Sequence, residues 1–158
     1  MNASKIRTLL LRAAVGVVAL LVLAQVVPYG RNHTNPEARE EPVWPSPAAR
    51  ALAVRACFDC HSNETRWPWY SHVAPVSWLV QNHVDVGRHV LNFSEWSKRS
   101  KHAREAPEAV REGEMPMPGY PEMHPEARLT PSEKQELEAA LKVMVGEAGA
   151  EKDEPKKD

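Results

Sequence analysis

The longest apolar run of the chain lies near its N-terminus. An uncharged apolar run extends from Ala13 to Val27, and three leucines precede it on the other side of Arg12. Counted from Leu9, the run is about long enough to cross the hydrocarbon core of a bilayer as a helix. We therefore predict a membrane anchor or signal segment over residues 1–27.

Beyond this run, apolar positions recur at helical spacing in separate segments. Ser46 before Pro47 is a helix-start signal, and so is Thr130 before Pro131 with Glu133 three residues after the threonine. The pattern predicts helices over residues 47–57, 75–91, roughly 97–110 and 131–145. In the second of these, one face is expected to carry Val76, Leu79, Val80, His83, Val84, Gly87, Val90 and Leu91.

The composition favours a small all-α protein. Its 158 residues include 14 prolines, and proline interrupts the hydrogen bonding of sheets. We expect a proline-rich linker over residues 28–45, a helical domain over 46–146 and a charged disordered tail over 147–158. The net charge of −1 provides no general basic field for nucleic acid.

The two cysteines of the chain lie together in the run CFDCH. Thiols at this spacing reach the two vinyl groups of one porphyrin and form thioethers, and the histidine that follows becomes an axial ligand of the iron. The sequence therefore predicts one covalent haem c, attached through Cys57 and Cys60, with His61 as the proximal ligand.

Other interpretations of the motif remain open at this stage. A thioredoxin-like dithiol usually accompanies a βαβ pattern, which is missing here. A zinc site needs four ligands, and His72 would have to join Cys57, Cys60 and His61. A chance occurrence of the motif is the remaining alternative. We favour haem over all three.

The second axial ligand is expected in the proline-rich run GEMPMPGYPEMHP. Met115 is the preferred candidate, because Gly113 shortly before it and Pro116 directly after it make a stiff loop, and thioether sulfur raises the haem potential. Met117 and His124 are the alternatives, and an open sixth position is the fourth.

An aromatic cluster follows the CFDCH motif. We expect Trp67, Trp69 and Tyr70 to line the haem pocket, since aromatic side chains bury a large area and offer a polar group. Arg66 is expected to neutralise a haem propionate. The basic residues from Lys98 to Arg111 are interpreted as a solvated helix face, with docking of an acidic redox partner or contact with anionic lipid as the alternatives.

Basic residues precede the apolar run. Lys5, Arg7 and Arg12 favour the cytoplasmic side, so the remainder of the chain would be exported. We predict a single-pass protein of the bacterial inner membrane with a periplasmic domain, or a periplasmic protein if the segment is cleaved. Haem attachment to CxxCH takes place on that side of the membrane.

The stretches PYGRNHTNP, RACFDCHSNETRWPWYSHVAPVSWLVQNHV and GEMPMPGYPEMHPEARLT resemble the bacterial haem-binding domain family. The resemblance covers about Pro28 to Val145. It implies a cytochrome-c-like, all-α domain around one haem, often behind a single membrane segment, in a redox setting. Cys57, Cys60 and His61 match the family's haem motif.

We expect this protein to transfer single electrons to and from periplasmic or membrane redox proteins, without catalytic residues of its own. The alternatives are a component of a haem peroxidase system and a haem-based sensor. Both need an exchangeable sixth ligand on the iron.

Overall fold

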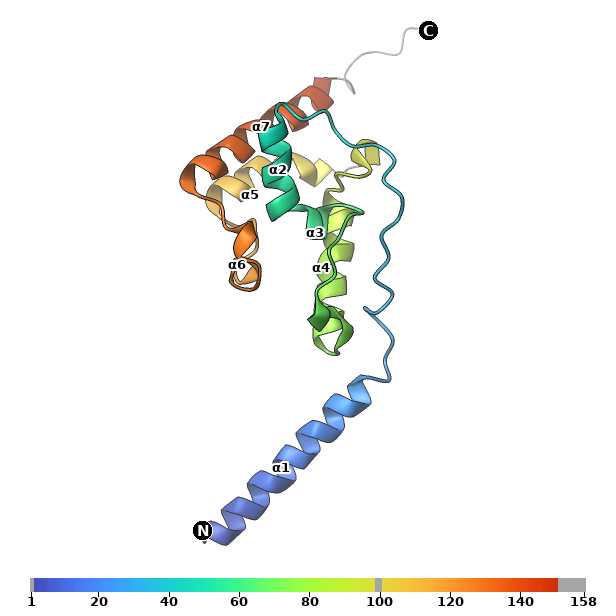
Figure 1. Cartoon of the computed structure of the whole chain (residues 1–158), viewed down its shortest axis with the longest axis vertical. Helices are drawn as coiled ribbons and strands as arrows, with labels where there is room; N and C mark the ends of the chain where they lie inside the picture. The colour runs from blue at the N-terminus through green and yellow to red at the C-terminus, as the bar shows by residue number, and fades with distance from the viewer. Residues whose placement is uncertain (1, 99–100, 151–158) are drawn as a thin grey trace. The chain divides into compact units, whose positions relative to one another are not determined.

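The computed structural model describes residues 2–98 and 101–150 and confirms an all-α protein (Figure 1). Within that part of the chain, one isolated bridge pairs Glu40 with Glu95 and no strand forms. The α-helices are α1 (Ala3–Ala24), α2 (Pro47–Ala56), α3 (Phe58–His61), α4 (Val76–Val90), α5 (Ala106–Glu112), α6 (Tyr120–Met123) and α7 (Pro131–Ala150). The 3-10 helices are η1 (Trp69–His72), η2 (Trp96–Lys98), η3 (Lys101–Glu105) and η4 (Pro125–Ala127).

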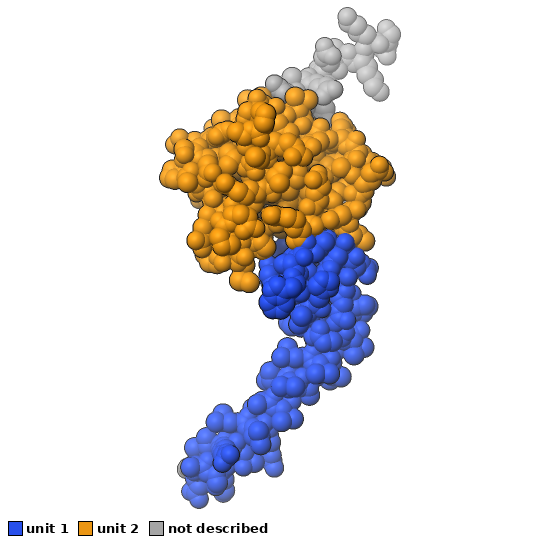
Figure 2. Space-filling view, viewed as in Figure 1, with its two compact units in different colours: residues 1–33, 67–83 blue, residues 34–66, 84–158 orange. Residues whose placement is uncertain are grey.

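Contacts divide the chain into two compact units (Figure 2). Unit 1 comprises Met1–His33 and Trp67–His83, and unit 2 comprises Thr34–Arg66 and Val84–Asp158. The division falls within α4.

Unit 1 contains α1, which is long and apolar enough to cross a membrane by length and composition. None of the described side chains of α1 is buried in the protein, so α1 is not a core helix. The expected N-terminal apolar helix is confirmed, and by composition alone it fits both a membrane anchor and a signal sequence.

The core of unit 2 forms where α5 and α2 pack against α7. Its buried members are Leu52, Ala53, Phe58, Leu91, Phe93, Ala103, Val110, Leu137, Leu141 and Met144. Aromatic rings extend this core, because Phe93 stacks on Phe58 at 5.3 Å and on Trp96 at 5.9 Å between ring centroids. Phe58 belongs to the CFDCH motif, so the motif is fixed to the core by one of its own residues.

The predicted helix starts are confirmed. The Ser46 hydroxyl accepts a hydrogen bond from the Ala49 N–H at 3.0 Å, with Pro47 as the first residue of α2. At α7, the Glu133 carboxylate accepts from the Thr130 N–H at 2.7 Å and pairs with Arg55 of α2 at 2.8 Å. These contacts, the Thr130 N–H foremost, lower the pKa of Glu133 to about 2.

Two segments depart from the predicted helices. The helix expected over roughly 97–110 is η2, η3 and the shorter α5, because Pro107 occupies the first turn of α5 and restricts the residue before it. Helix α7 continues to Ala150, beyond the expected end of the domain at 146. The rest of the predicted tail, residues 151–158, lies outside the described residues.

The expected apolar face of α4 is only partly buried. Val84 and Gly87 are buried, as is Leu91 directly after the helix. In the unit 1 half of the helix, however, Val76 is 42% exposed and Leu79 is 56% exposed. The face expected from the apolar spacing is therefore buried around Val84 and Gly87 and exposed in the first turns of α4.

Candidate functional site

The CFDCH motif forms the junction between α2 and the single-turn helix α3. Cys57 ends α2 with its N–H donating to the Ala53 carbonyl at 2.8 Å, and its own carbonyl accepts from the His61 N–H at 2.9 Å. The side chains of the two residues between the cysteines have different surroundings. Phe58 enters the apolar core and Asp59 enters a polar network, so the spacer fixes the turn from which Cys57, Cys60 and His61 project.

His61 is held by two backbone carbonyls of unit 2. Its Nδ1 lies 3.0 Å from the Gly87 oxygen and 3.0 Å from the Leu91 oxygen. Carbonyls only accept, so Nδ1 carries the proton and Nε2 keeps its lone pair. Burial lowers the pKa of His61 against the opposing effect of these two hydrogen bonds. The imidazole is therefore neutral and presents Nε2 as a ligand atom.

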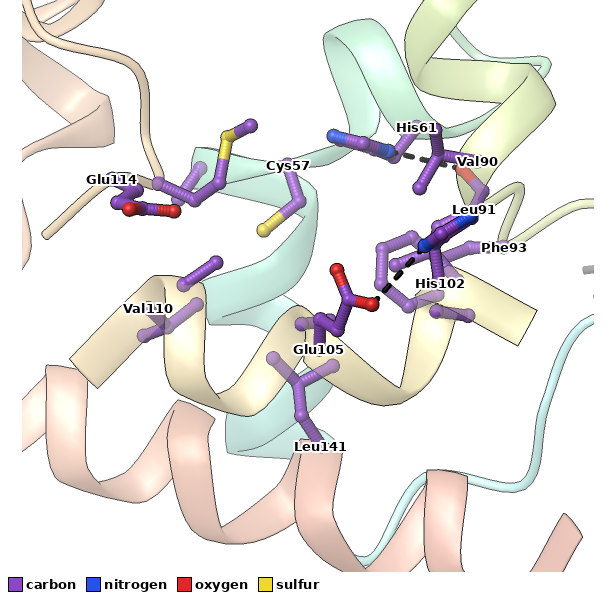
Figure 3. A pocket seen from close by; sticks show the side chains of 15 residues that line it. Cys57, His61, Val90, Leu91, Phe93, His102, Glu105, Val110, Glu114 and Leu141 are labelled. Atoms are coloured by element: carbon purple, nitrogen blue, oxygen red, sulfur yellow. Dashed lines mark hydrogen bonds and ion pairs between the residues drawn. The ribbon is translucent and has the colours of Figure 1, made fainter. Parts of the chain in front are cut away.

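A cavity of about 230 Å³ opens beside this turn (Figure 3). Its lining is mostly apolar and includes Cys57, His61, Phe93, Val110, Met115 and Leu141. Figure 3 shows the side chains of Cys57 and His61 projecting toward it from the same short segment. The cavity thus combines an apolar enclosure with a thiol, an imidazole and a thioether.

The electrostatic surroundings of the two thiols differ from those of a reactive dithiol. Both cysteines are free, and burial raises the pKa of Cys57 to about 12 and that of Cys60 to about 11. Redox-active CxxC pairs have a lowered thiol pKa instead. This electrostatic setting does not support the thioredoxin-like interpretation.

The described residues also do not assemble the zinc site considered above. Among residues 2–98 and 101–150, no three His, Cys, Asp or Glu side chains lie together in a group that could hold a metal ion. A single imidazole can be the protein's ligand where the other ligands of the metal come from an organic macrocycle, as in haem.

The comparison with protein families decides among these interpretations. The family model of the haem-binding domain matches residues 19–142, most of the chain. The chain belongs to the haem-binding domain family. No curated protein and no solved structure gives a significant match.

The residues of this haem-binding domain fit the group that it binds. Haem is held in an apolar pocket, and a histidine nitrogen is one of its common iron ligands. The cavity in unit 2 has a mostly apolar lining, and the Nδ1 hydrogen bonds of His61 leave its Nε2 free for that role.

The three residues expected as candidates for the second iron ligand have different surroundings. Met115 lines the cavity with Cys57 and His61. Met117 is half-buried but does not line that cavity. His124 stacks on the Tyr120 ring at 4.2 Å between centroids, and its Nδ1 lies 3.7 Å from the Glu126 carboxylate.

The other predicted pocket residues do not line this cavity, nor does Cys60. In unit 1, Trp67 stacks on His33, and its buried Nε1 has no hydrogen-bond partner among the described residues. Trp69 is 77% exposed and packs edge-on against Tyr70. A haem-lining role for these aromatics stays a prediction.

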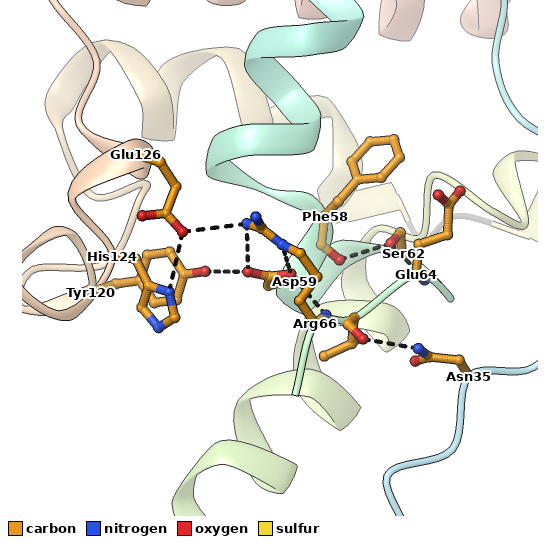
Figure 4. Close-up of polar contacts among 10 residues, drawn as sticks. Asn35, Phe58, Asp59, Ser62, Glu64, Arg66, Tyr120, His124 and Glu126 are labelled. Atoms are coloured by element: carbon orange, nitrogen blue, oxygen red, sulfur yellow. Dashed lines mark hydrogen bonds and ion pairs between the residues drawn. The ribbon is translucent and has the colours of Figure 1, made fainter. Parts of the chain in front are cut away.

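Sequence reasoning missed the role of Asp59, the second spacer residue of the motif. Its carboxylate accepts from the Tyr120 hydroxyl at 2.7 Å and from the Arg66 guanidinium at 3.1 Å (Figure 4). Burial and the bond to Asp59 raise the pKa of Tyr120. The network ties the CFDCH motif to α6, directly after the loop that carries Met115, and it engages the Arg66 that was expected at a propionate.

A second missed group stabilises the residues after His61. Arg88 of α4 donates to the Ser62 carbonyl at 2.7 Å and to the Thr65 hydroxyl at 2.9 Å. The buried Asn63 accepts from the Asn92 amide at 2.9 Å. Some of these residues follow the motif, and Arg88 lies on α4, which was predicted from its apolar positions alone. The sequence pattern therefore assigned no function to any of them.

Gly87 provides a test of how closely α4 approaches the motif. A Cβ at this position would overlap the carbonyl oxygen of Cys60 and lie 3.0 Å from its carbonyl carbon. Backbone atoms of this turn cannot move without displacing His61, so we expect Gly87→Ala to destabilise the haem-loaded chain by about 1–3 kcal/mol. Thermal unfolding followed at the haem absorbance measures the change.

Gly146→Ala is the matched control, since it also lies in a helix but a Cβ there meets nothing within 4 Å. It should be neutral or slightly stabilising, because alanine favours helix over glycine by up to about 1 kcal/mol. Equal stability of the two variants would contradict the close approach.

Proposed function

We propose that Cys57 and Cys60 attach the haem covalently, as in a c-type cytochrome, and that His61 is the proximal ligand. Each thiol would add across one vinyl group, with a carbon–sulfur bond formed, the thiol hydrogen transferred to the other vinyl carbon and no oxidant required. The observation that carries the proposal is the orientation of His61, whose Nδ1 is occupied by two carbonyls while Nε2 is left free. Such a hydrogen bond fixes the tautomer and the ring plane of a ligating histidine.

We further propose Met115 as the second axial ligand. It is the candidate that shares the cavity with Cys57 and His61. The bond between Asp59 and Tyr120 supports this choice, because it holds the end of the Met115 loop to the haem motif. Methionine opposite histidine raises the reduction potential relative to two nitrogen ligands.

The activity we propose is single-electron transfer with periplasmic or membrane redox proteins. The haem supplies a reversible one-electron couple when bound. The chain's residues would fill both axial positions and exclude water through the apolar lining from α5 and α7. With His61 and Met115 as ligands, the iron would have no open position for a peroxide or gas ligand.

Location follows from α1 and its flanks. We propose that α1 spans the bacterial inner membrane with Lys5, Arg7 and Arg12 on the cytoplasmic side. The haem-binding domain then lies in the periplasm, where c-type haem is attached.

Carbon monoxide binding tests electron transfer against the alternatives. The reduced full-length protein is expected to leave carbon monoxide unbound and to titrate as one reversible one-electron couple. Rapid binding of carbon monoxide by the wild-type protein would contradict two filled axial positions and favour a sensor or a component of a peroxidase.

A further inference from the structure

A segment of unit 1 lacks formal charge. No Asp, Glu, Lys or Arg occurs between Trp67 and His83, although these four types make up 26% of the chain. We call Trp67–His83 the uncharged segment. At the average frequency it would carry several charged side chains, as solvent-facing helices and turns normally do.

The uncharged segment exposes large apolar side chains. Trp69 is 77% exposed, Leu79 56%, Val73 46% and Val76 42%. We call these four side chains the apolar surface. The four residues lie within eleven positions of the chain, and exposed apolar side chains that gather in one region often mark contact with a partner or a membrane.

The uncharged segment is bound to the end of α1. Gln25, the residue directly after the helix, donates from its side-chain nitrogen to the Ala74 carbonyl at 2.8 Å and accepts from the Ala74 N–H at 3.1 Å. Gly30 is buried against Ser77, and a Cβ there would lie 2.7 Å from the Ser77 carbonyl carbon. The chain after α1 therefore packs on the uncharged segment instead of forming a free tether.

A second set of contacts joins the chain after α1 to the uncharged segment, at His33. The His33 Nε2 lies 3.0 Å from the Ser71 carbonyl oxygen, and the His33 ring stacks on Trp67 at 4.6 Å. Residues 25–33 and 67–77 are thus joined at both ends of their contact. Because of these contacts, the depth in the membrane at which α1 ends also determines the level of the uncharged segment.

The apolar part of α1 gives that level. Lys5, Arg7 and Arg12 lie in the first half of the helix, on the proposed cytoplasmic side, and the uncharged apolar run begins at Ala13 and reaches the helix end at Ala24. The end at Ala24 is therefore the end that leaves the roughly 30 Å hydrocarbon core of a bilayer. When α1 spans that core, Gln25 and the Ala74 bonded to it lie at its boundary with the headgroups. Tryptophan and tyrosine are enriched at this boundary, and the uncharged segment contains Trp67, Trp69, Tyr70 and Trp78.

We infer that the apolar surface rests in the headgroup region of the membrane that α1 spans. The occupant of the surface is the lipid bilayer itself, and the lack of charge suits both the neutral and the anionic lipids there. The inference rests on the proposed membrane insertion of α1 and extends it, because it gives the chain a second membrane contact beyond the helix.

Cysteine accessibility in vesicles tests the inference. The full chain is reconstituted in phosphatidylcholine vesicles as Val73→Cys and, separately, as Val143→Cys, and the rate of reaction with a water-soluble maleimide is measured. The two positions are matched at 46% and 45% exposure, and Val143 lies on α7 in unit 2. The wild-type chain gives the background rate from Cys57 and Cys60.

Alkylation requires the thiolate, and a rise of one unit in thiol pKa at the apolar boundary reduces the thiolate about tenfold. We therefore expect Val73→Cys to react at least about tenfold more slowly than Val143→Cys in vesicles, and at the same rate once the chain is denatured. Equal rates in vesicles would overturn the inference.

A third variant, Leu20→Cys within α1, distinguishes failure of the inferred membrane contact from failure of α1 as a membrane anchor. Protection of position 20 together with rapid reaction at position 73 overturns only the apolar surface as a membrane contact. Reaction of Leu20→Cys as fast as Val143→Cys would show that α1 is outside the bilayer, which overturns both the proposed anchor and the inference built on it.

Discussion

Met115→Ala is expected to open one axial position of the haem iron. Removal of the thioether from the cavity that also contains Cys57 and His61 leaves no sulfur for the iron. We expect the sulfur-to-iron charge-transfer band of the oxidised protein to disappear and the reduced protein to bind carbon monoxide. The potential should fall by roughly 0.1–0.3 V, a fraction of the ~0.8 V range that axial ligands set.

Met117→Ala is the control for this experiment. Met117 is two residues away and similarly half-buried, but it does not line the cavity. Its removal should leave the absorption spectrum, carbon monoxide binding and potential unchanged. If Met117→Ala, and not Met115→Ala, opened the iron, the assignment of the second ligand would be wrong. If neither variant did, His124→Ala is the next to examine.

Replacement of Cys57 and Cys60 together by alanine is expected to abolish covalent haem attachment. Each thiol supplies one carbon–sulfur bond, and no other cysteine exists in the chain to replace them. Haem staining of the denatured double variant should fall to background. Haem held only by coordination to His61 would still bind the folded chain, so absorbance before denaturation is the informative comparison.

The single variants refine that result. Cys57→Ala and Cys60→Ala should each keep one thioether, so some haem remains attached, and the unsaturated vinyl group shifts the absorption bands. Far-UV circular dichroism checks that the helices persist. Covalent staining that survives in the double variant would disprove the role of both cysteines.

Local sequence signals predicted the parts of the fold that depend on nearest neighbours. The starts of α2 and α7 were predicted because Ser46, Thr130 and Glu133 satisfy the free N–H groups of a helix within one turn. Helix α4 was predicted from its apolar spacing. What that spacing could not reveal is that Val76 and Leu79 face outward, since periodicity does not distinguish a protein core from a lipid surface.

The site was predictable to the extent that it is contiguous in sequence. Cys57, Cys60 and His61 lie in one motif, whereas the carbonyls that orient His61 come from Gly87 and Leu91. Backbone groups have no side-chain signature, so this arrangement emerges only from the fold. The Asp59–Tyr120 bond likewise joins residues far apart in the sequence.

The most direct test of covalent attachment through the CFDCH motif is the intact mass of the full-length protein made in a bacterium that attaches c-type haem. The account predicts the mass of the polypeptide, with or without its N-terminal segment, plus one haem, and no haem released by acidic organic solvent. A polypeptide of unmodified mass that releases all of its haem to the solvent would contradict the account.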